Sequence, residues 1–350
     1  MAAEATSGGV GTACATTSGA TAGGLSVHRA RRVGRRAAVY ALLWVGVVVM
    51  VVPFVWMVTT SLKSPIEILH FPPTWVPTGQ FVRDASGEWQ EVYVASRDRE
   101  AGTASVRPVD GGPARTVDVT EVRDRVRFRL SNYAAAWRQA PFARYYLNTV
   151  IVVLATLAGQ LVTSALAAYA FARMRFPGRD AIFLVLLSMM MVPEPVYLVP
   201  SYIVLAKFGW IDTYQAMIVP WLAYIFSIFL LRQHFKTIPN DLYDAAIIDG
   251  CSRFAFLWRI VLPLSKAVLA AVTIFTVVST WNSFLWPLVM TNTPSVRPLQ
   301  VGLARFAQEQ GTNHELMMAA AVFSIAPLVV AYFMAQKQII QSLATSGIKG

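Results

Sequence analysis

Residues 240–263 read NDLYDAAIIDGCSRFAFLWRIVLP and lie between two long apolar segments. A polar stretch of this length between apolar runs predicts a loop that is held against a membrane surface. Its most regular feature is a set of residues at fixed spacings: Asp244, Ala245, Ala246, Gly250, Ile260, Leu262 and Pro263. Because the loop joins two apolar segments, the topology of the chain depends on how many of its apolar segments cross the membrane.

The composition favours a membrane protein, because 55% of the 350 residues are hydrophobic and only 14% are charged, whereas soluble domains carry about a quarter charged residues. A membrane-spanning helix needs about 20 apolar residues. Backbone groups in lipid must be hydrogen-bonded internally, so the apolar runs predict helices and an all-α integral membrane fold. Six runs are long enough: about Ala38–Leu62, Tyr145–Phe171, Ala181–Leu205, Tyr214–Leu231, Ala267–Met290 and Leu316–Met334.

Basic residues are distributed unevenly between the two ends of these spans. Fifteen Lys and Arg residues flank the spans on the side of the quoted loop, and three lie in the short loops opposite, namely Lys207, Arg297 and Arg305. The positive-inside rule then predicts six spans with both termini in the cytoplasm. The net charge of +11 therefore points to a lipid bilayer and not to nucleic acid.

The long loop after the first span is the exception to this charge pattern. Residues 63–144 carry 12 basic and 10 acidic residues, but long loops escape the positive-inside rule, so we expect this loop outside the cell. Alternating residues and the turn Asp110-Gly111-Gly112-Pro113 predict a small β-rich insert at about residues 78–127. A lid, a docking surface and a loop without specific function are all compatible with the insert.

These observations divide the chain into parts along the sequence. We expect a disordered basic cytoplasmic tail at 1–36, the first transmembrane helix at 37–62, the extracytoplasmic loop at 63–144, a core of five transmembrane helices at 145–342 that contains a cytoplasmic loop at 232–266, and a cytoplasmic C-terminal tail at 343–350.

Local signals predict a short helix over Asp241–Asp249, in the quoted loop. Asn240 is a good N-cap, and Asp241 and Asp244 lie in the first turn, where carboxylates favour the positive end of the helix dipole. Gly250 suits the left-handed position that ends a helix. An ordinary loop lying on lipid headgroups would show the same signals.

The side chains of this short helix suit contact with a partner. Ala245 and Ala246 are small enough to let another surface approach closely, while Tyr243, Ile247 and Ile248 offer apolar contacts.

The spacing of these residues resembles the EAA loop of ABC importer permeases, which reads E-A-A, three residues, G, nine residues, and I-x-L-P. Only the first residue differs, because Asp244 stands where the family has Glu. The resemblance implies that the loop forms a coupling helix that docks on a separate ATP-hydrolysing subunit. The coupling residues would be Asp241, Tyr243, Asp244, Ala245, Ala246, Ile247, Asp249, Gly250, Ile260, Leu262 and Pro263.

Other segments are similar to the carbohydrate class of these permeases, the maltose-type second subunit. They include Phe71-Pro72-Pro73-Thr74-Trp75, Leu147-Asn148-Thr149, Trp281-Asn282-Ser283-Phe284-Leu285-Trp286 and the tail Ser346-Gly347-Ile348-Lys349-Gly350. The likeness covers about residues 40–77 and 128–350 and leaves out the insert. It implies a sugar permease of the bacterial plasma membrane that is not itself an enzyme. Its partners would be a second homologous permease, ATPase subunits and an extracytoplasmic solute-binding protein.

Polar and aromatic residues inside the spans are candidates for the solute pathway: Asn148, Glu194, Trp281, Asn282, Phe284 and Trp286. Aromatic faces stack on sugar rings and amides hydrogen-bond hydroxyls, although the Trp residues equally suit an interfacial aromatic belt. A buried amide such as Asn282 must find partners, and an intramembrane carboxylate such as Glu194 is a functional candidate by default. Glu194 equally suits a position near the outer headgroups.

No phosphate-binding loop, Gly-x-Ser-x-Gly motif or His pair at metal-ligand spacing is present in the sequence. We therefore expect no catalytic residue, cofactor or metal. A related permease for peptide, phosphate or glycerol phosphate remains an alternative, although a phosphate ester would favour Arg or Lys in the spans. A self-contained secondary transporter or a multi-span enzyme would need a catalytic cluster or further ion-coupling carboxylates besides Glu194.

Overall fold

The computed structural model describes residues 21–68, 73–84, 86–98, 101–109, 111–311 and 313–347. The chain divides into two compact units, residues 1–56 and residues 57–350. Of the expected tails at 1–36 and 343–350, residues 1–20 and 348–350 lie outside the described residues.

Helix α1 (Thr21–Ser61) supplies the described part of the first unit through its residues 21–56, and its apolar portion Gly34–Ser61 is 28 residues long, enough to cross a membrane. The helix begins at Thr21 and so includes residues 21–36 of the expected tail.

Within the described part of the chain, four helical stretches are long and apolar enough to span a bilayer, and up to six if each of two bent pairs is one span. Besides α1 they are α4 (Phe142–Arg173), residues Tyr214–Thr237 and the portion His314–Met334 of α15 (His314–Gly347). The predominantly helical membrane fold predicted from composition is therefore confirmed.

Two of the predicted continuous spans are broken. The third consists of α5 (Arg179–Met189) and α6 (Glu194–Lys207), bent by 100° at a break that holds Pro193. The cause is that proline lacks an N–H and keeps the residue before it out of the helical region. The fifth stops early, because α12 (Lys266–Trp281) ends and a separate helix α13 (Leu285–Met290) follows.

The stretch Tyr214–Thr237 is also irregular. It comprises α7 (Tyr214–Ile218), the short 3-10 turn η2 (Val219–Trp221) and α8 (Ile225–Thr237). The shorter helices are α2 (Pro65–Ile68), α3 (Ser131–Gln139), α9 (Asn240–Ile248), α10 (Arg253–Phe256), the π turn η3 (Leu257–Val261), α11 (Leu262–Leu264) and α14 (Leu299–Gln310). The sequence analysis did not predict α14.

The predicted β-rich insert is present as one antiparallel sheet of five strands in the order β4-β3-β2-β1-β5. A short 3-10 turn, η1 (Val119–Glu121), lies between the last two strands. The strands are β1 (Thr78–Arg83), β2 (Trp89–Asp98), β3 (Thr103–Pro108), β4 (Arg115–Asp118) and β5 (Arg123–Val126). The predicted turn lies between β3 and β4, where Gly111 has a φ of 84°, a value that glycine adopts without strain.

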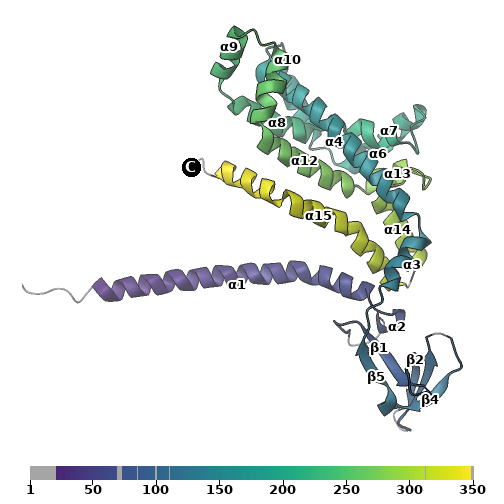
Figure 1. Ribbon diagram of the computed structural model, residues 1–350. Coiled ribbons are helices and arrows are strands. Elements are labelled where there is room, and N and C mark those ends of the chain that lie inside the picture. Colours follow the sequence, from purple (N-terminus) through teal and green to yellow (C-terminus); the bar gives the residue numbers. More distant parts are fainter. Residues whose placement is uncertain are drawn as a thin grey trace, which may run out of the picture. The chain divides into compact units, whose positions relative to one another are not determined.

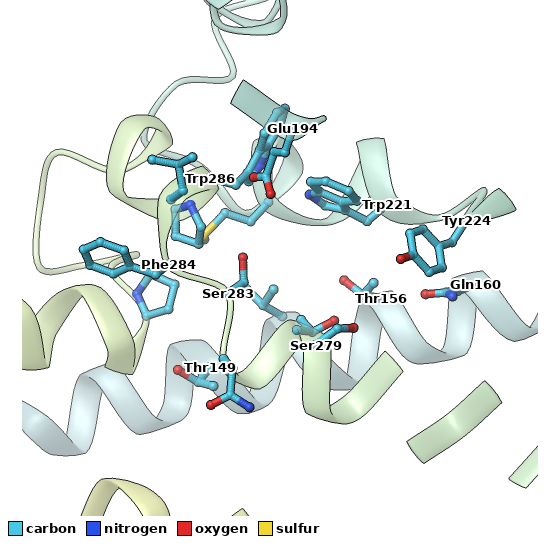
Figure 2. A pocket seen from close by; sticks show the side chains of 17 residues that line it. Thr149, Thr156, Gln160, Glu194, Trp221, Tyr224, Ser279, Ser283, Phe284 and Trp286 are labelled. Atoms are coloured by element: carbon cyan, nitrogen blue, oxygen red, sulfur yellow. The ribbon is translucent and has the colours of Figure 1, made fainter. Parts of the chain in front are cut away.

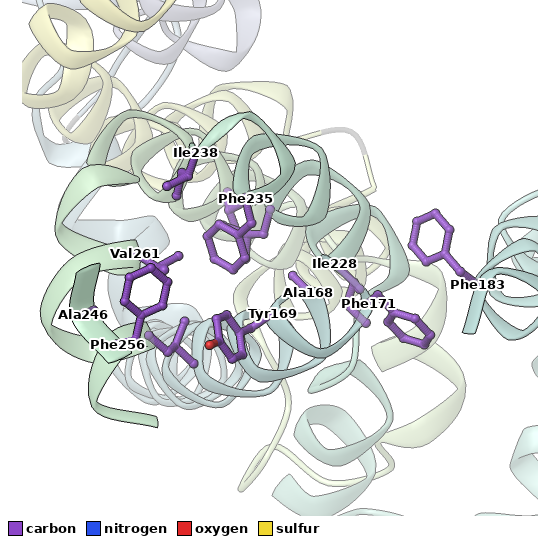
Figure 3. Packing of buried hydrophobic residues seen from close by; sticks show 13 residues of the cluster. Ala168, Tyr169, Phe171, Phe183, Ile228, Phe235, Ile238, Ala246, Phe256 and Val261 are labelled. Carbon is purple, nitrogen blue, oxygen red and sulfur yellow. The ribbon is translucent and has the colours of Figure 1, made fainter. Parts of the chain in front are cut away.

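Helix α4 organises the second unit. Its 32 residues extend for about 48 Å, at about 1.5 Å per residue. One end lies beside α3 and α14, and the other lies near α10 (Figure 1). Near that second end, α4 packs against α8, α9 and α10 through a buried cluster that includes Ala168, Tyr169, Leu231, Phe235, Ala246, Phe256 and Val261 (Figure 3).

The first turns of α4 pack against α14 at a glycine. A Cβ built at Gly302 would lie 2.2 Å from Cδ2 of Tyr145, far closer than real contacts allow. Gly302 therefore permits an approach of the two helices that no other residue permits without a shift of the Tyr145 ring.

We predict that Gly302→Ala lowers the free energy of unfolding by about 1–3 kcal/mol, because the added methyl group overpacks this contact. The melting temperature of the purified protein in detergent measures the effect. Gln308→Ala, at an exposed position of the same helix, serves as the control and should melt like the native protein. Equal melting temperatures for the two variants would contradict the close packing.

Candidate functional site

Helix α9 ends in a Schellman motif built on Gly250. The N–H of Gly250 donates to the carbonyl of Ile247 at 2.9 Å, and the N–H of Cys251 donates to the carbonyl of Ala246 at 2.8 Å. Gly250 has a φ of 75°, so the expectation of a left-handed residue at this position is confirmed. The motif fixes where the short helix stops and turns the chain toward α10.

The beginning of α9 differs from the expected N-cap. Asn240 is the first helical residue, Pro239 precedes it, and no side chain caps the helix. The Oδ1 atom of Asn240 instead accepts a hydrogen bond from Nη1 of Arg173 at 2.5 Å. The competing partner is a charged donor, which forms a stronger hydrogen bond than a backbone N–H.

The two faces of α9 have different surroundings. On the inner face Ala246 is buried, and the ring of Tyr243 meets that of Phe256 edge-on with centroids 5.1 Å apart. On the outer face Ile248 is 85% exposed. Ile248 was not among the predicted coupling residues. Those that are exposed are Asp241, Asp244, Ala245, Ile247, Asp249, Gly250 and Pro263, whereas Ile260 and Leu262 are partly buried. The outer face of α9 thus presents carboxylates, the small Ala245 and the exposed Ile248 to a partner.

Arg173 ties α9 to the end of α4. Besides Asn240, its guanidinium donates through Nη2 to the backbone carbonyls of Phe235, at 2.8 Å, and Ile238. One side chain therefore joins the last turn of α4, the end of α8 and the start of α9. The sequence analysis counted Arg173 only among the basic flanking residues, since its partners are set by tertiary packing.

The segment after α10 bends at the membrane side of the loop. The stretch Arg253–Leu264 and α12 meet at 82°. The bend falls just after Pro263, at Ser265, whose hydroxyl donates to the carbonyl of Val261 at 2.6 Å. Because Pro263 has no N–H to donate, the series of backbone hydrogen bonds along the helix is already interrupted at this residue.

A second candidate site is a cavity of about 310 Å³ beside the middle of α4 (Figure 2). It lies where three helix breaks meet: before α6, between η2 and α8, and between α12 and α13. It is lined by Thr149, Val152, Thr156, Gln160, Glu194, Met217, Trp221, Tyr224, Ser279, Thr280, Asn282, Ser283, Phe284, Leu285, Trp286, Pro287 and Pro298. Helix breaks thus gather polar groups at one place inside an apolar bundle.

Four of the six predicted pathway residues line this cavity: Glu194, Asn282, Phe284 and Trp286. Glu194 is the first residue of α6, directly after the break at Pro193. The indole N–H of Trp286 donates to the carbonyl of Ala216 at 3.0 Å, so this ring forms a fixed wall of the cavity.

Asn148 and Trp281 do not line the cavity. The Asn148 amide is fully buried, donating to the carbonyl of Arg297 at 2.8 Å and accepting from the hydroxyl of Tyr214 at 2.7 Å. Trp281 is buried in an apolar cluster, where its ring lies 6.2 Å from that of Tyr146. The Asn148 amide thus joins α4 to the segment before α14 and to α7, and the Trp281 ring packs among apolar side chains.

Most of the polar lining was not predicted from the sequence. Thr149, Thr156 and Gln160 occur on α4 at spacings that place them on one helix face. This pattern is visible in the sequence, but the apolar residues around it are far more numerous. None of the described lining residues is Lys or Arg. Among the described residues, no group of three or more His, Cys, Asp or Glu is placed to hold a metal ion.

Comparisons with known proteins bear on both sites. Residues 160–345 match the family described as binding-protein-dependent transport system inner membrane component. Over 205 residues the chain is 35% identical to the arabinooligosaccharides transport system permease protein AraQ of Halalkalibacterium halodurans, with 59% of this chain and 72% of that protein covered.

Two other relatives are named for different substrates. The chain is 33% identical over 221 residues to the diacetylchitobiose uptake system permease protein NgcG of Streptomyces coelicolor, covering 62% of this chain and 73% of that protein. It is 34% identical over 208 residues to the sn-glycerol-3-phosphate transport system permease protein UgpE of Yersinia pestis, covering 59% and 74%.

A solved structure shares the fold. A chain from a bacterial ABC transporter that imports the acidic polysaccharide alginate superposes with a TM-score of 0.65 at 21% identity, covering 88% of this chain and 96% of that chain. At this identity the likeness concerns the fold alone.

We predict that Arg173→Gln speeds hydrogen exchange of the amides in residues 240–248 by about tenfold, since the lost bonds join a charged donor to α8 and α9. Mass spectrometry of the purified protein in nanodiscs measures this. Arg175→Gln is the control, because Arg175 is exposed two residues away. Unchanged exchange in the Arg173 variant would show that the guanidinium does not hold α9.

Proposed function

The chain belongs to the family of binding-protein-dependent transport system inner membrane components, a family of multi-pass permeases of ABC transporters, and we propose that it imports a neutral mono- or oligosaccharide. The observation that carries this proposal is the cavity at the helix breaks, which offers hydroxyls, amides and aromatic walls together with a single carboxylate. Hydroxyls and amides hydrogen-bond sugar hydroxyl groups, and aromatic walls cover the apolar faces of sugar rings.

The charge of the cavity favours a neutral sugar over a phosphate ester. UgpE is named for sn-glycerol-3-phosphate, whereas AraQ and NgcG are named for oligosaccharides. Phosphate recognition relies on Arg or Lys, and the described lining contains Glu194 and neither of these residues. A carboxylate in a low-dielectric cavity repels a phosphate, so the electrostatics support the oligosaccharide assignment.

The outer face of α9 suits docking of a separate ATPase subunit. In this proposal the ATPase contacts Asp241, Asp244, Ala245, Ile248 and Asp249 from the cytoplasm. The inner face and Arg173 then pass the movement of α9 to α4, whose middle lines the cavity. A second permease completes the pathway, six spans place both termini in the cytoplasm, and the solute-binding protein delivers sugar from the opposite side.

Alternating access follows from this arrangement as a coupling between two sites. If ATPase closure favours one position of α9 and sugar favours the corresponding state of the cavity, each ligand changes the affinity for the other by the same factor. Transport then requires an intact connection between α9 and the cavity rather than any bond-making step in this chain.

We predict that Ala245→Trp abolishes ATPase docking and reduces uptake by at least about tenfold, because a large side chain on the exposed face keeps the partner away. Since Ala245 is exposed, the variant should still insert and melt normally. Co-purification of the ATPase and uptake in cells measure the two effects. Ala181→Trp, at another exposed alanine, should leave both unchanged, and normal docking by the Ala245 variant would contradict the assignment.

We predict that Glu194→Leu lowers uptake of a neutral oligosaccharide by about tenfold and that Glu194→Gln lowers it less, since an amide keeps a hydrogen-bonding oxygen. Radiolabelled uptake into proteoliposomes of the assembled importer measures this, with arabinooligosaccharide, diacetylchitobiose and glycerol 3-phosphate as competitors. Glu309→Gln, at an exposed position, is the control. Competition by glycerol 3-phosphate alone would refute the neutral-sugar assignment.

A further inference from the structure

The five-stranded insert lies outside the residues 160–345 that match the family, so the family does not explain it. Strand register shows that its two faces differ. One face carries the valines that form the core of the insert: Val82, Val92, Val94, Val106 and Val117. Since neighbouring residues of a strand point to opposite faces, the alternate residues form the second face.

The second face is rich in arginine and aromatic residues. Register pairs Arg83 with Trp89, Arg123 with Phe81, and Arg107 with Tyr93, and Arg125 lies on the same face two residues from Arg123. We call the surface formed by Arg83, Arg107, Arg123 and Arg125 around Trp89 the arginine face. All four of these arginines are exposed.

The arginine face has excess positive charge. Among the described residues, no carboxylate lies within 4.0 Å of its four guanidinium groups, because Glu91 is taken by Arg129 and Arg127. Glu91 lies on the same side of the sheet and is engaged by Arg127 and Arg129, and the other acids on this side, Asp98 and Asp118, belong to the opposite end of β2 and to β4. Asp118 accepts hydrogen bonds from the N–H and the hydroxyl of Thr120, which lower the pKa of its carboxyl group. Since Asp is ionised at neutral pH, negative charge lies at that end of the sheet and positive charge at the other.

Two of the guanidinium groups are held in place before any partner binds. The guanidinium carbon of Arg125 lies 4.2 Å from the centroid of the Trp89 ring, and that of Arg83 lies 5.2 Å away. Stacking on an aromatic ring restricts the arginine and leaves its N–H groups directed outward. It also occupies the ring, so Trp89 is not free to stack on a sugar.

The insert is attached at the end of α4 that is far from α9. The N–H of Arg129, just after β5, donates to the carbonyl of Leu62, and the amide of Asn132 in α3 donates to the carbonyls of Ser61 and Lys63 at 2.9 Å. Helix α3 precedes α4, whereas α9 contacts the last turn of α4. Whichever side of the membrane α9 occupies, the insert therefore lies toward the other.

We propose that the arginine face is a docking surface for an acidic patch on the extracytoplasmic solute-binding protein. This inference rests on the proposed function, which places α9 in the cytoplasm and a binding protein outside. Planar guanidinium groups fixed on a rigid sheet match carboxylates on a folded surface, with two parallel hydrogen bonds each. An anionic lipid surface needs only mobile positive charge, and a free polysaccharide would use an uncovered ring.

The test uses the complete importer in nanodiscs and the purified solute-binding protein of the same import system. We expect the double variant Arg123→Glu and Arg125→Glu to weaken binding by at least about tenfold, mainly through slower association, and to reduce its salt dependence. The milder pair Arg123→Gln and Arg107→Gln leaves the Trp89 stack intact and should weaken binding about threefold. Arg97→Glu, exposed on the valine side of the sheet, is the matched control.

The measured affinities decide whether the arginine face is a docking surface. Unchanged affinity in both arginine variants, or equal loss in the Arg97 control, overturns the docking surface. The docking surface is also overturned if the arginine variants bind the solute-binding protein normally but adsorb less to vesicles containing phosphatidylglycerol. That result would assign the arginine face to lipid binding. If the native importer transports sugar at saturating binding protein while the variants reach the same maximal rate, docking alone is affected and the proposed function stands.

Discussion

The hydrogen-bonding demand of the backbone in an apolar environment governs this molecule. A helix in lipid satisfies its own N–H and C=O groups, and each interruption leaves groups that need other partners. In this chain the interruptions before α6, before α8 and between α12 and α13 lie around one cavity. The places where the bundle departs from ideal helix are therefore the places where it can contact a polar solute.

Helix α4 connects the two candidate sites. Its middle supplies Thr149, Thr156 and Gln160 to the cavity, and its last turn supplies Arg173 to α8 and α9. The apolar cluster around Phe235 and Phe256 holds the same elements together by close packing. A shift of α9 thus displaces packed neighbours as well as one guanidinium, because protein interiors transmit displacement rather than absorb it.

The insert adds a separate surface to this transport core. Its valines bury one side of a small sheet and leave an arginine-rich side exposed. A soluble sheet of this size gains little from an unpaired cluster of charge, since like charges repel, so the charge is better understood as a feature for binding than for folding. In the proposed assembly, α9 and the insert would bind different partners at opposite ends of α4.

The sequence by itself determined the membrane class, the positions of most helices, the β insert and the Gly250 turn, because hydrophobic length, alternation and the left-handed glycine are local properties. It also singled out Glu194 and Asn282, which are conspicuous in apolar runs. It missed Arg173 and the polar face of α4, and it grouped Asn148 and Trp281 with the other pathway candidates although these two do not line the cavity. Only the tertiary structure decided which polar groups meet in a cavity and which face of α9 is free, because those outcomes depend on bends at helix breaks and on packing between segments far apart in the chain.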